Sequence, residues 1–169
     1  PAAQRALALW DQAGDAHQAL LAACVCVRSH FGPGPDLDRA CNELRARAAA
    51  LPDATVHAQL QVHGALIAAA TERSDLEAIL EGRLAEAALA AQLGLQTRAD
   101  AAESNVVFAL NAMERYAEAA SRGRALLARI DASSSTTKGN LPWVLMGLLK
   151  ALVMKRSYDE AQALVPRAW

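Results

Sequence analysis

The chain has 169 residues, of which 53% are hydrophobic but only 4% aromatic, with 17 basic against 18 acidic side chains. A net charge of -1 gives no electrostatic basis for binding nucleic acid or an anionic membrane surface, so neither is expected as a direct partner. No apolar run approaches the length of a membrane span, which predicts a soluble chain. Its core must consist of Ala, Leu and Val, whose small side chains favour close-packed helices over a sheet sandwich.

Apolar residues recur at helical spacing along nearly the whole chain, and residues that cap or end helices divide it into about nine helices. The expected helices cover about 2–13, 15–30, 36–51, 54–73, 75–94, 97–115, 116–131, 140–156 and 158 onwards. The expected N-caps are Asp15, Asp36, Asp53, Ser74 or Asp75, and Asn140. Gly14 and Gly94 are expected to end helices, Thr97 to open one, and Pro166 to bend or end the last.

A short motif returns along the chain, each time at the expected start of a helix. Residues 115–119 (RYAEA) return as 157–161 (SYDEA), and a weaker copy covers 74–78 (SDLEA). These copies are roughly 40 residues apart, a period that indicates stacked helix pairs. We therefore predict a single solenoid over residues 1–169. Its expected parts are a partial repeat at 1–13 and helix pairs at 15–51, 53–94, 97–131 and 140–169.

The motif resembles that of the tetratricopeptide repeat, in which a polar turn, an aromatic residue, two polar residues and an Ala join the paired helices. The supporting positions are Val106, Val107, Leu110, Leu148, Leu149 and Leu152 in first helices, and Ala119, Gly123 and Ala161 in second helices. The period exceeds the standard of roughly 34 residues, and the standard Gly before the aromatic is missing. Longer units of this kind are similar to those in the C-terminal solenoids of large bacterial ATP-dependent regulators, the LuxR-family activators of the maltose-activator type. The resemblance implies an all-α, right-handed superhelical stack of antiparallel helix hairpins.

The resemblance also implies a binding surface, because first helices line the concave groove of tetratricopeptide arrays. It places on that surface Ser104, Phe108, Asn111, Trp143, Met146, Lys150 and Met154, and in the upstream unit Gln61 and Thr71. Aromatic and Met side chains beside a few polar groups give the adaptable contact area of a protein-binding patch. The alternative for Phe108, Trp143 and Met146 is burial against a neighbouring helix. The Lys and Asn clamp that holds a terminal carboxylate in chaperone-binding members is not recognisable here.

Two further groups of residues are weighed as sites. Cys26 and His30 share a helix face and Cys41 lies on the next helix, but Cys24 points elsewhere and no fourth ligand is suitably spaced. We therefore expect buried free thiols, in a reducing compartment, and no metal. Residues 133–140 (SSSTTKGN) lack the residue order of a phosphate loop, which predicts a solvated linker.

No catalytic arrangement is recognised, since the four His have no fixed relation to a nucleophile and the carboxylates, Glu86 among them, are expected on solvated faces. We expect a non-enzymatic, cytoplasmic interaction module without a cofactor. Its partner would be a protein or peptide, or other domains of a longer bacterial signalling or transcriptional regulator from which this chain is a piece. One alternative is an effector sensor in which Ser104, Asn111 and Lys150 converge on a small molecule. Another is a homodimer formed through the terminal repeats around Trp169.

Overall fold

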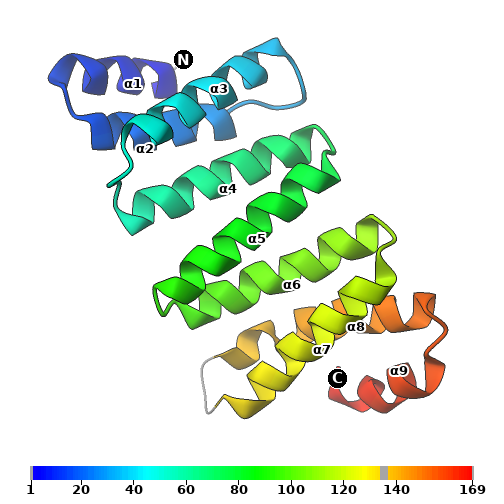
Figure 1. Ribbon diagram of the computed structural model, residues 1–169. Helices are drawn as coiled ribbons and strands as arrows, with labels where there is room; N and C mark the ends of the chain where they lie inside the picture. The colour runs from blue at the N-terminus through cyan, green and yellow to red at the C-terminus, as the bar shows by residue number, and fades with distance from the viewer. Residues whose placement is uncertain (1, 134–136, 169) are drawn as a thin grey trace. The chain divides into compact units, whose positions relative to one another are not determined.

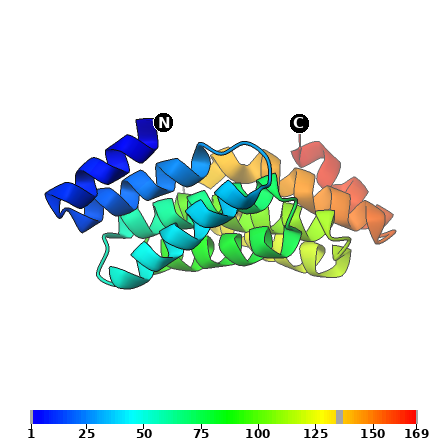
Figure 2. The ribbon, with the colours of Figure 1, turned by 90° about the horizontal axis from the view of Figure 1, so that it is seen from above.

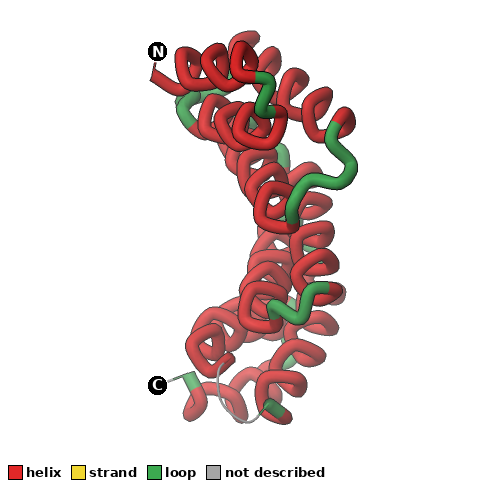
Figure 3. The backbone as a smooth tube through the Cα atoms, turned by 90° about the vertical axis from the view of Figure 1, so that its left-hand side faces the viewer, coloured by secondary structure: helices red, strands yellow, loops and turns green. Residues whose placement is uncertain are grey.

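The computed structural model describes residues 2–133 and 137–168. Within these ranges the backbone forms nine α-helices and two short 3-10 helices, and no β-strand (Figures 1 and 3). The α-helices are α1 (Ala2–Ala13), α2 (Ala16–Arg28), α3 (Pro35–Ala50), α4 (Val56–Glu72), α5 (Leu76–Gln92), α6 (Gln96–Ala112), α7 (Tyr116–Ala132), α8 (Leu141–Met154) and α9 (Tyr158–Leu164). The 3-10 helices are η1 (Thr137–Asn140) and η2 (Val165–Arg167). Within the groups α1–α4 and α6–α9, helices adjacent in sequence pack together, as do α2 with α4 and α6 with α8, which is consistent with an α-solenoid-like stack. The predicted all-α class is therefore confirmed.

Five turns between helices share one backbone conformation. The residue just past the preceding helix has a positive φ in each: Gly14 (70°), Ser74 (54°), Gly94 (69°), Glu114 (59°) and Arg156 (61°). The next residue then donates its N–H to a carbonyl five residues back, as Arg115 does to Leu110 across 2.9 Å. This is the Schellman turn that satisfies the last carbonyls of a helix. The motif repeated at Tyr116 and Tyr158 therefore marks the first helical residue after such a turn.

Several expected helix caps are confirmed. The Asp15 carboxylate accepts a hydrogen bond from the Gln18 N–H across 3.0 Å, and Asp75 does the same for Ala78 across 3.1 Å. The last α-helix ends at Leu164, just before the Pro166 that was expected to bend or end it. In these turns the cap side chain satisfies one of the first free N–H groups of the helix. The local sequence is therefore sufficient to predict where the helix begins.

Other caps were predicted wrongly. Helix α3 begins at Pro35 after Gly34, so Asp36 lies inside the first turn. The cap of α4 is Thr55, whose hydroxyl accepts from the Ala58 N–H across 3.3 Å, and Asp53 lies before it. Helix α6 begins one residue before the expected Thr97.

The Asn140 amide also has a role other than capping. It makes no cap bond and instead donates to the Thr97 carbonyl across 3.1 Å. The predicted linker at 133–140 is a 3-10 helix over Thr137–Asn140, and its residues 134–136 lie outside the described residues. Trp169, the residue expected to support a homodimer, lies outside them as well.

The chain divides into two compact units, Pro1–Gly82 and Arg83–Trp169. In the first unit α1 and α2 form an antiparallel hairpin, and α2 also packs against α3 and α4 (Figures 1 and 2). Cys24, Cys26 and Cys41 lie buried in its core as free thiols, as predicted. Burial disfavours the thiolate and raises the pKa of Cys24 to about 11, so this thiol stays protonated.

In the second unit α7 packs against both α6 and α8. The apolar positions predicted from the repeat are largely buried here: Val106, Val107, Leu110, Leu148 and Leu152 are fully so, and Leu149 is half-buried. The small positions Ala119, Gly123 and Ala161 are buried too. A Cβ at Gly123 would lie 3.2 Å from the Leu148 side chain, which explains why a residue without a side chain stands there.

Candidate ligand-binding surface

All seven positions expected on the binding surface lie on α6 and α8 of the second unit, two helices that pack against each other. On α8 the side chains are exposed: Trp143 is 57% exposed, Met146 48% and Met154 51%, and Lys150 is exposed as well. On α6, Phe108 is half-buried, whereas Ser104 and Asn111 are buried. In the upstream unit Gln61 is half-buried, with its Oε1 accepting from Arg28 Nη1, and Thr71 is exposed.

Asn111 is a packing residue of the α6–α8 contact rather than a surface residue. Its Nδ2 donates to the Gly147 carbonyl across 2.8 Å. A Cβ at Gly147 would lie 3.0 Å from Cγ1 of Val107, so the two helix backbones approach closely at this level. The prediction that Asn111 lies on the open groove is therefore corrected, because its face of α6 is covered by α8.

Towards the start of α8, the same α6–α8 interface opens into a cavity of about 300 Å³. Its lining residues are Ala101, Ser104, Asn105 and Phe108 of α6, with Asn140 of η1 and Trp143 of α8. Three of the predicted residues, Ser104, Phe108 and Trp143, are thus brought together. Met146, Lys150 and Met154 are not among the lining residues. Ala101 and Asn105 went unrecognised, although they follow from extending the Ser104–Phe108 face of α6 by one helical turn.

Ser104 is the unusual member of this lining. The residue is only 4% exposed, and its Oγ has no hydrogen-bond partner among the described residues. A buried hydroxyl without a partner costs about 1–3 kcal/mol and calls for an explanation. The expected position of Ser104 on an exposed surface is therefore corrected. Ser104 lines a cavity and is buried from open solvent.

A second cavity in this unit is lined by two side chains that bond a buried carboxylate, Gln96 and Arg129. It has a volume of about 400 Å³, and Gln96, Glu103 and Arg129 are among the polar side chains that line it. Asp100 is 1% exposed, and its Oδ1 accepts from Arg129 Nε across 3.0 Å, from Arg129 Nη2 across 2.7 Å and from Gln96 Nε2 across 2.8 Å. Because this buried charge has its cation, we interpret Asp100 as part of the packing.

Glu86 forms a similar buried pair, which overturns its expected place on a solvated face. It is 6% exposed and receives hydrogen bonds from Arg83 Nη1 across 2.8 Å and from Arg98 Nη2 across 3.0 Å. Two guanidinium groups, one on α5 and one on α6, offset the cost of burying one carboxylate. Helical spacing could show only the pairing with Arg83 on the same helix, since Arg98 lies on α6.

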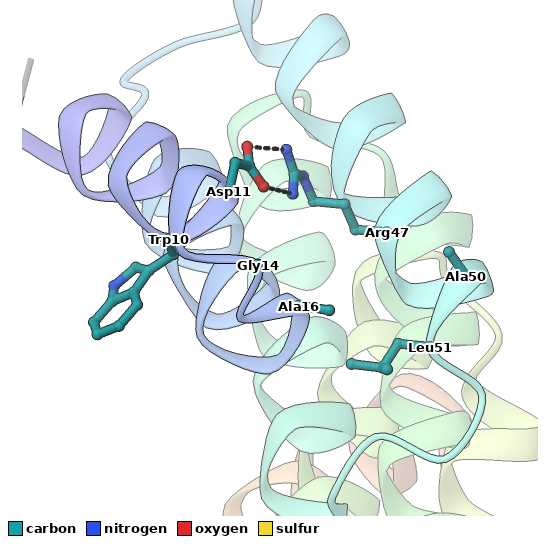
Figure 4. A pocket seen from close by; sticks show the side chains of 7 residues that line it. All are labelled: Trp10, Asp11, Gly14, Ala16, Arg47, Ala50 and Leu51. Atoms are coloured by element: carbon teal, nitrogen blue, oxygen red, sulfur yellow. Dashed lines mark hydrogen bonds and ion pairs between the residues drawn. The ribbon is translucent and has the colours of Figure 1, made fainter.

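In the first unit a cavity of about 290 Å³ lies where the turn between α1 and α2 meets the end of α3 (Figure 4). The Arg47 guanidinium donates to both Asp11 oxygens, across 2.7 and 2.8 Å. This hydrogen bonding holds the pKa of Asp11 below its usual range. The Trp10 side chain is directed away from the other lining residues (Figure 4). The two charges of this cavity satisfy each other, so we interpret the pair as a clamp between α1 and α3.

Neither a metal-binding set nor a membrane span is found in the part of the chain that the structure describes. No group of three or more His, Cys, Asp or Glu side chains is arranged there to hold a metal ion. None of the described helices has the length and apolarity needed to cross a bilayer.

The fold defines the chain as an all-α stack of helix hairpins. The chain matches no protein-family model, no curated protein and no solved structure. The tetratricopeptide type of the repeat therefore stays a prediction.

Proposed function

We propose that the chain is a non-catalytic, cytoplasmic protein-interaction module that binds a partner segment on the exposed side chains of α8. The observation that supports this is one continuous row. Trp143, Met146, Lys150 and Met154 lie at spacings of three or four residues and share one helix face. Three of the four are large apolar side chains that are about half exposed. Grouped exposed apolar residues of this kind mark interaction sites, whereas single ones are ordinary.

The chemistry of the row favours an amphipathic helix or extended segment as its occupant. Trp supplies a large rigid contact and Met adapts its shape to the partner, which are properties of residues that dominate binding energy. Lys150 sits between Met146 and Met154 and adds one positive charge to an otherwise apolar row. We therefore expect a partner with apolar residues three or four apart and an acidic residue beside them.

The repeat motif supports the wider setting of the proposal. Its similarity to the solenoids of bacterial ATP-dependent regulators favours a role in a signalling or transcriptional regulator. In that setting the segment bound by α8 would come from another domain of the parent protein or from a separate protein.

A peptide-display selection tests this function. Random peptides selected on the whole chain should share apolar residues at helical spacing. Their affinity should fall at least about ten-fold with Trp143→Ser, since a central Trp typically contributes 2 kcal/mol or more. Val165→Ser is the matched control, because Val165 is 44% exposed in the same unit but lies outside the row. Equal losses in the two variants, or none in Trp143→Ser, would exclude α8 as the binding surface.

One observation favours a second candidate, effector binding. The expected convergence of Ser104, Asn111 and Lys150 is not found, because Asn111 lies in the α6–α8 contact and neither it nor Lys150 lines the cavity. Asn111 Nδ2 donates to the Gly147 carbonyl, and its buried Oδ1 has no partner among the described residues. Ser104 does line a cavity with a hydroxyl that is free of partners in the described chain. The residues that line this cavity indicate the class of ligand that it would bind.

A further inference from the structure

We propose that the cavity between α6 and the start of α8 binds a small neutral phenol, whose hydroxyl group pairs with Ser104. The proposal deepens the effector-binding candidate and is independent of whether α8 also binds a protein. It depends on the composition of the cavity walls, on the unpartnered Ser104 Oγ and on the packing that keeps the cavity open.

The walls select a neutral aromatic ligand. Ala101, Phe108 and Trp143 supply apolar surface, and Asn105 and Asn140 supply uncharged amides. No charged side chain is among the described residues that line the cavity, so an ionised ligand would lose hydration without gaining a counter-charge from them. Two aromatic side chains favour a ring, which they can contact by offset stacking or edge to face. The volume of about 300 Å³ lies at the small end of ligand sites, which suits a single ring.

Ser104 supplies the polar specificity. Its Oγ has no partner among the described residues, so its hydrogen-bonding capacity is unused. The Oγ exposes less than 1 Å² in this structure, and because it has no hydrogen bond to break, rotation about χ1 can turn it towards a ligand in the cavity. A hydroxyl group both donates and accepts, and therefore matches the hydroxyl of a phenol in either direction. Binding such a ligand would remove the cost of leaving Ser104 unpaired, which is why a buried polar group discriminates strongly between ligands with and without its partner.

The packing around the cavity explains why it does not simply close. At Gly147 the two helices pack tightly, and a Cβ there would lie 3.8 Å from Cζ of Phe108. The Phe108 ring therefore stands beside this tight contact and borders the cavity. Beyond it, two of the three other α6 residues that line the cavity, Ala101 and Ser104, have side chains too small to fill the space. Asn140 holds the opposite side through its bond to the Thr97 carbonyl.

The test compares two ligands that differ by one hydroxyl group, p-cresol and toluene. Each is titrated into the whole chain while the amide resonances of Ser104 and Asn105 and the Trp143 indole resonance are followed by NMR. A cavity that only excludes water would favour toluene, which is less hydrated. A cavity with Ser104 as its polar anchor should bind p-cresol roughly three- to ten-fold more tightly, the value of one such hydrogen bond.

The variant Ser104→Ala removes the hydroxyl and leaves the fold, since the lost oxygen has no partner to abandon. It should abolish the preference for p-cresol, while Trp143→Ser should weaken both ligands. The proposal is wrong if toluene binds the unaltered chain as tightly as p-cresol does. A p-cresol preference that persists in Ser104→Ala would also overturn it.

Peptide competition separates this inference from the protein-binding function. Displacement of selected peptides by p-cresol, together with Tyr in those peptides, would identify the phenol as a partner's tyrosine side chain. Peptides that bind Ser104→Ala normally and are not displaced would identify it as a free small molecule. Failure of the α8 surface to bind any peptide leaves the p-cresol and toluene comparison unaffected, so the two proposals fail separately.

Discussion

Asn111 of α6 and Gly147 of α8 are joined by a hydrogen bond inside the core of the second unit, from Nδ2 to the backbone carbonyl across 2.8 Å. Asn111→Ala should lower the free energy of unfolding by about 1–2 kcal/mol, because it removes the donor and leaves a small void. Urea denaturation measures the loss. Asn105→Ala, at an exposed position of the same helix, should change it by less than about 0.5 kcal/mol. Equal effects would show that the hydrogen bond contributes nothing specific.

Two glycines inside helices should respond oppositely to Ala. At Gly82 of α5 a Cβ would lie 2.6 Å from Cγ1 of Ile67, whereas at Gly64 of α4 nothing lies within 4 Å. Gly82→Ala should therefore destabilise the fold by about 1–3 kcal/mol through overpacking. Gly64→Ala should stabilise it by about 0.5–1 kcal/mol through helix propensity. Thermal unfolding of both variants gives the comparison, and a stabilising Gly82→Ala would show that α4 and α5 can move apart freely.

The turn at Glu114 carries backbone strain that glycine would relieve. Glu114 has φ 59°, a left-handed conformation that costs a residue with a side chain roughly 1 kcal/mol. Glu114→Gly should raise the midpoint of thermal unfolding despite the loss of a side chain. Ala128→Gly, at an exposed position within α7, should lower it by the usual cost of glycine in a helix. A fall in both variants would mean that flexibility of the unfolded chain outweighs the strain.

The buried ion pair of Asp100 and Arg129 should be asymmetric. Asp100 is 1% exposed but the Arg129 side chain is 45% exposed, so only the carboxylate depends on its partner for solvation. Arg129→Ala should cost about 3 kcal/mol by leaving that charge buried and unpaired. Adding Asp100→Ala to the same protein should recover part of the loss. Denaturation of the two single variants and the double variant measures this, and a double variant as unstable as the sum of both changes would contradict it.

The clamp between Asp11 and Arg47 predicts a pH dependence. Because hydrogen bonding to Arg47 lowers the pKa of Asp11 in the folded chain, its contribution is present above the unfolded pKa and is lost as the pH falls through the folded one. A carboxylate NMR titration should place the Asp11 pKa below 3.8. Arg47→Lys, which cannot bond both oxygens in a fork, should raise it, whereas Arg45→Lys on the same helix should not. An unchanged value in Arg47→Lys would exclude the bidentate pair as the cause.

Local features of the sequence were sufficient to predict the helices. The repeated motif correctly placed the starts of α7 and α9 at Tyr116 and Tyr158, because a turn and the residues that follow it act over only a few positions. Choices between neighbouring caps were less secure. Thr55 rather than Asp53 caps α4, since any polar side chain near a helix start competes for the same N–H groups.

The candidate site shows what the sequence by itself could not determine. The resemblance placed Ser104, Phe108 and Asn111 on one surface, and their spacing puts them on one face of α6, but only the packing of α8 decides that Asn111 is buried and Ser104 borders a cavity. Likewise the burial of the Glu86 and Asp100 carboxylates has no local sign, because Arg98 and Arg129, which pair with them, come from other helices. Periodicity determines which residues share a face, since it depends on helix geometry alone. What covers that face depends on contacts between segments far apart in sequence, and these exist only in the tertiary structure.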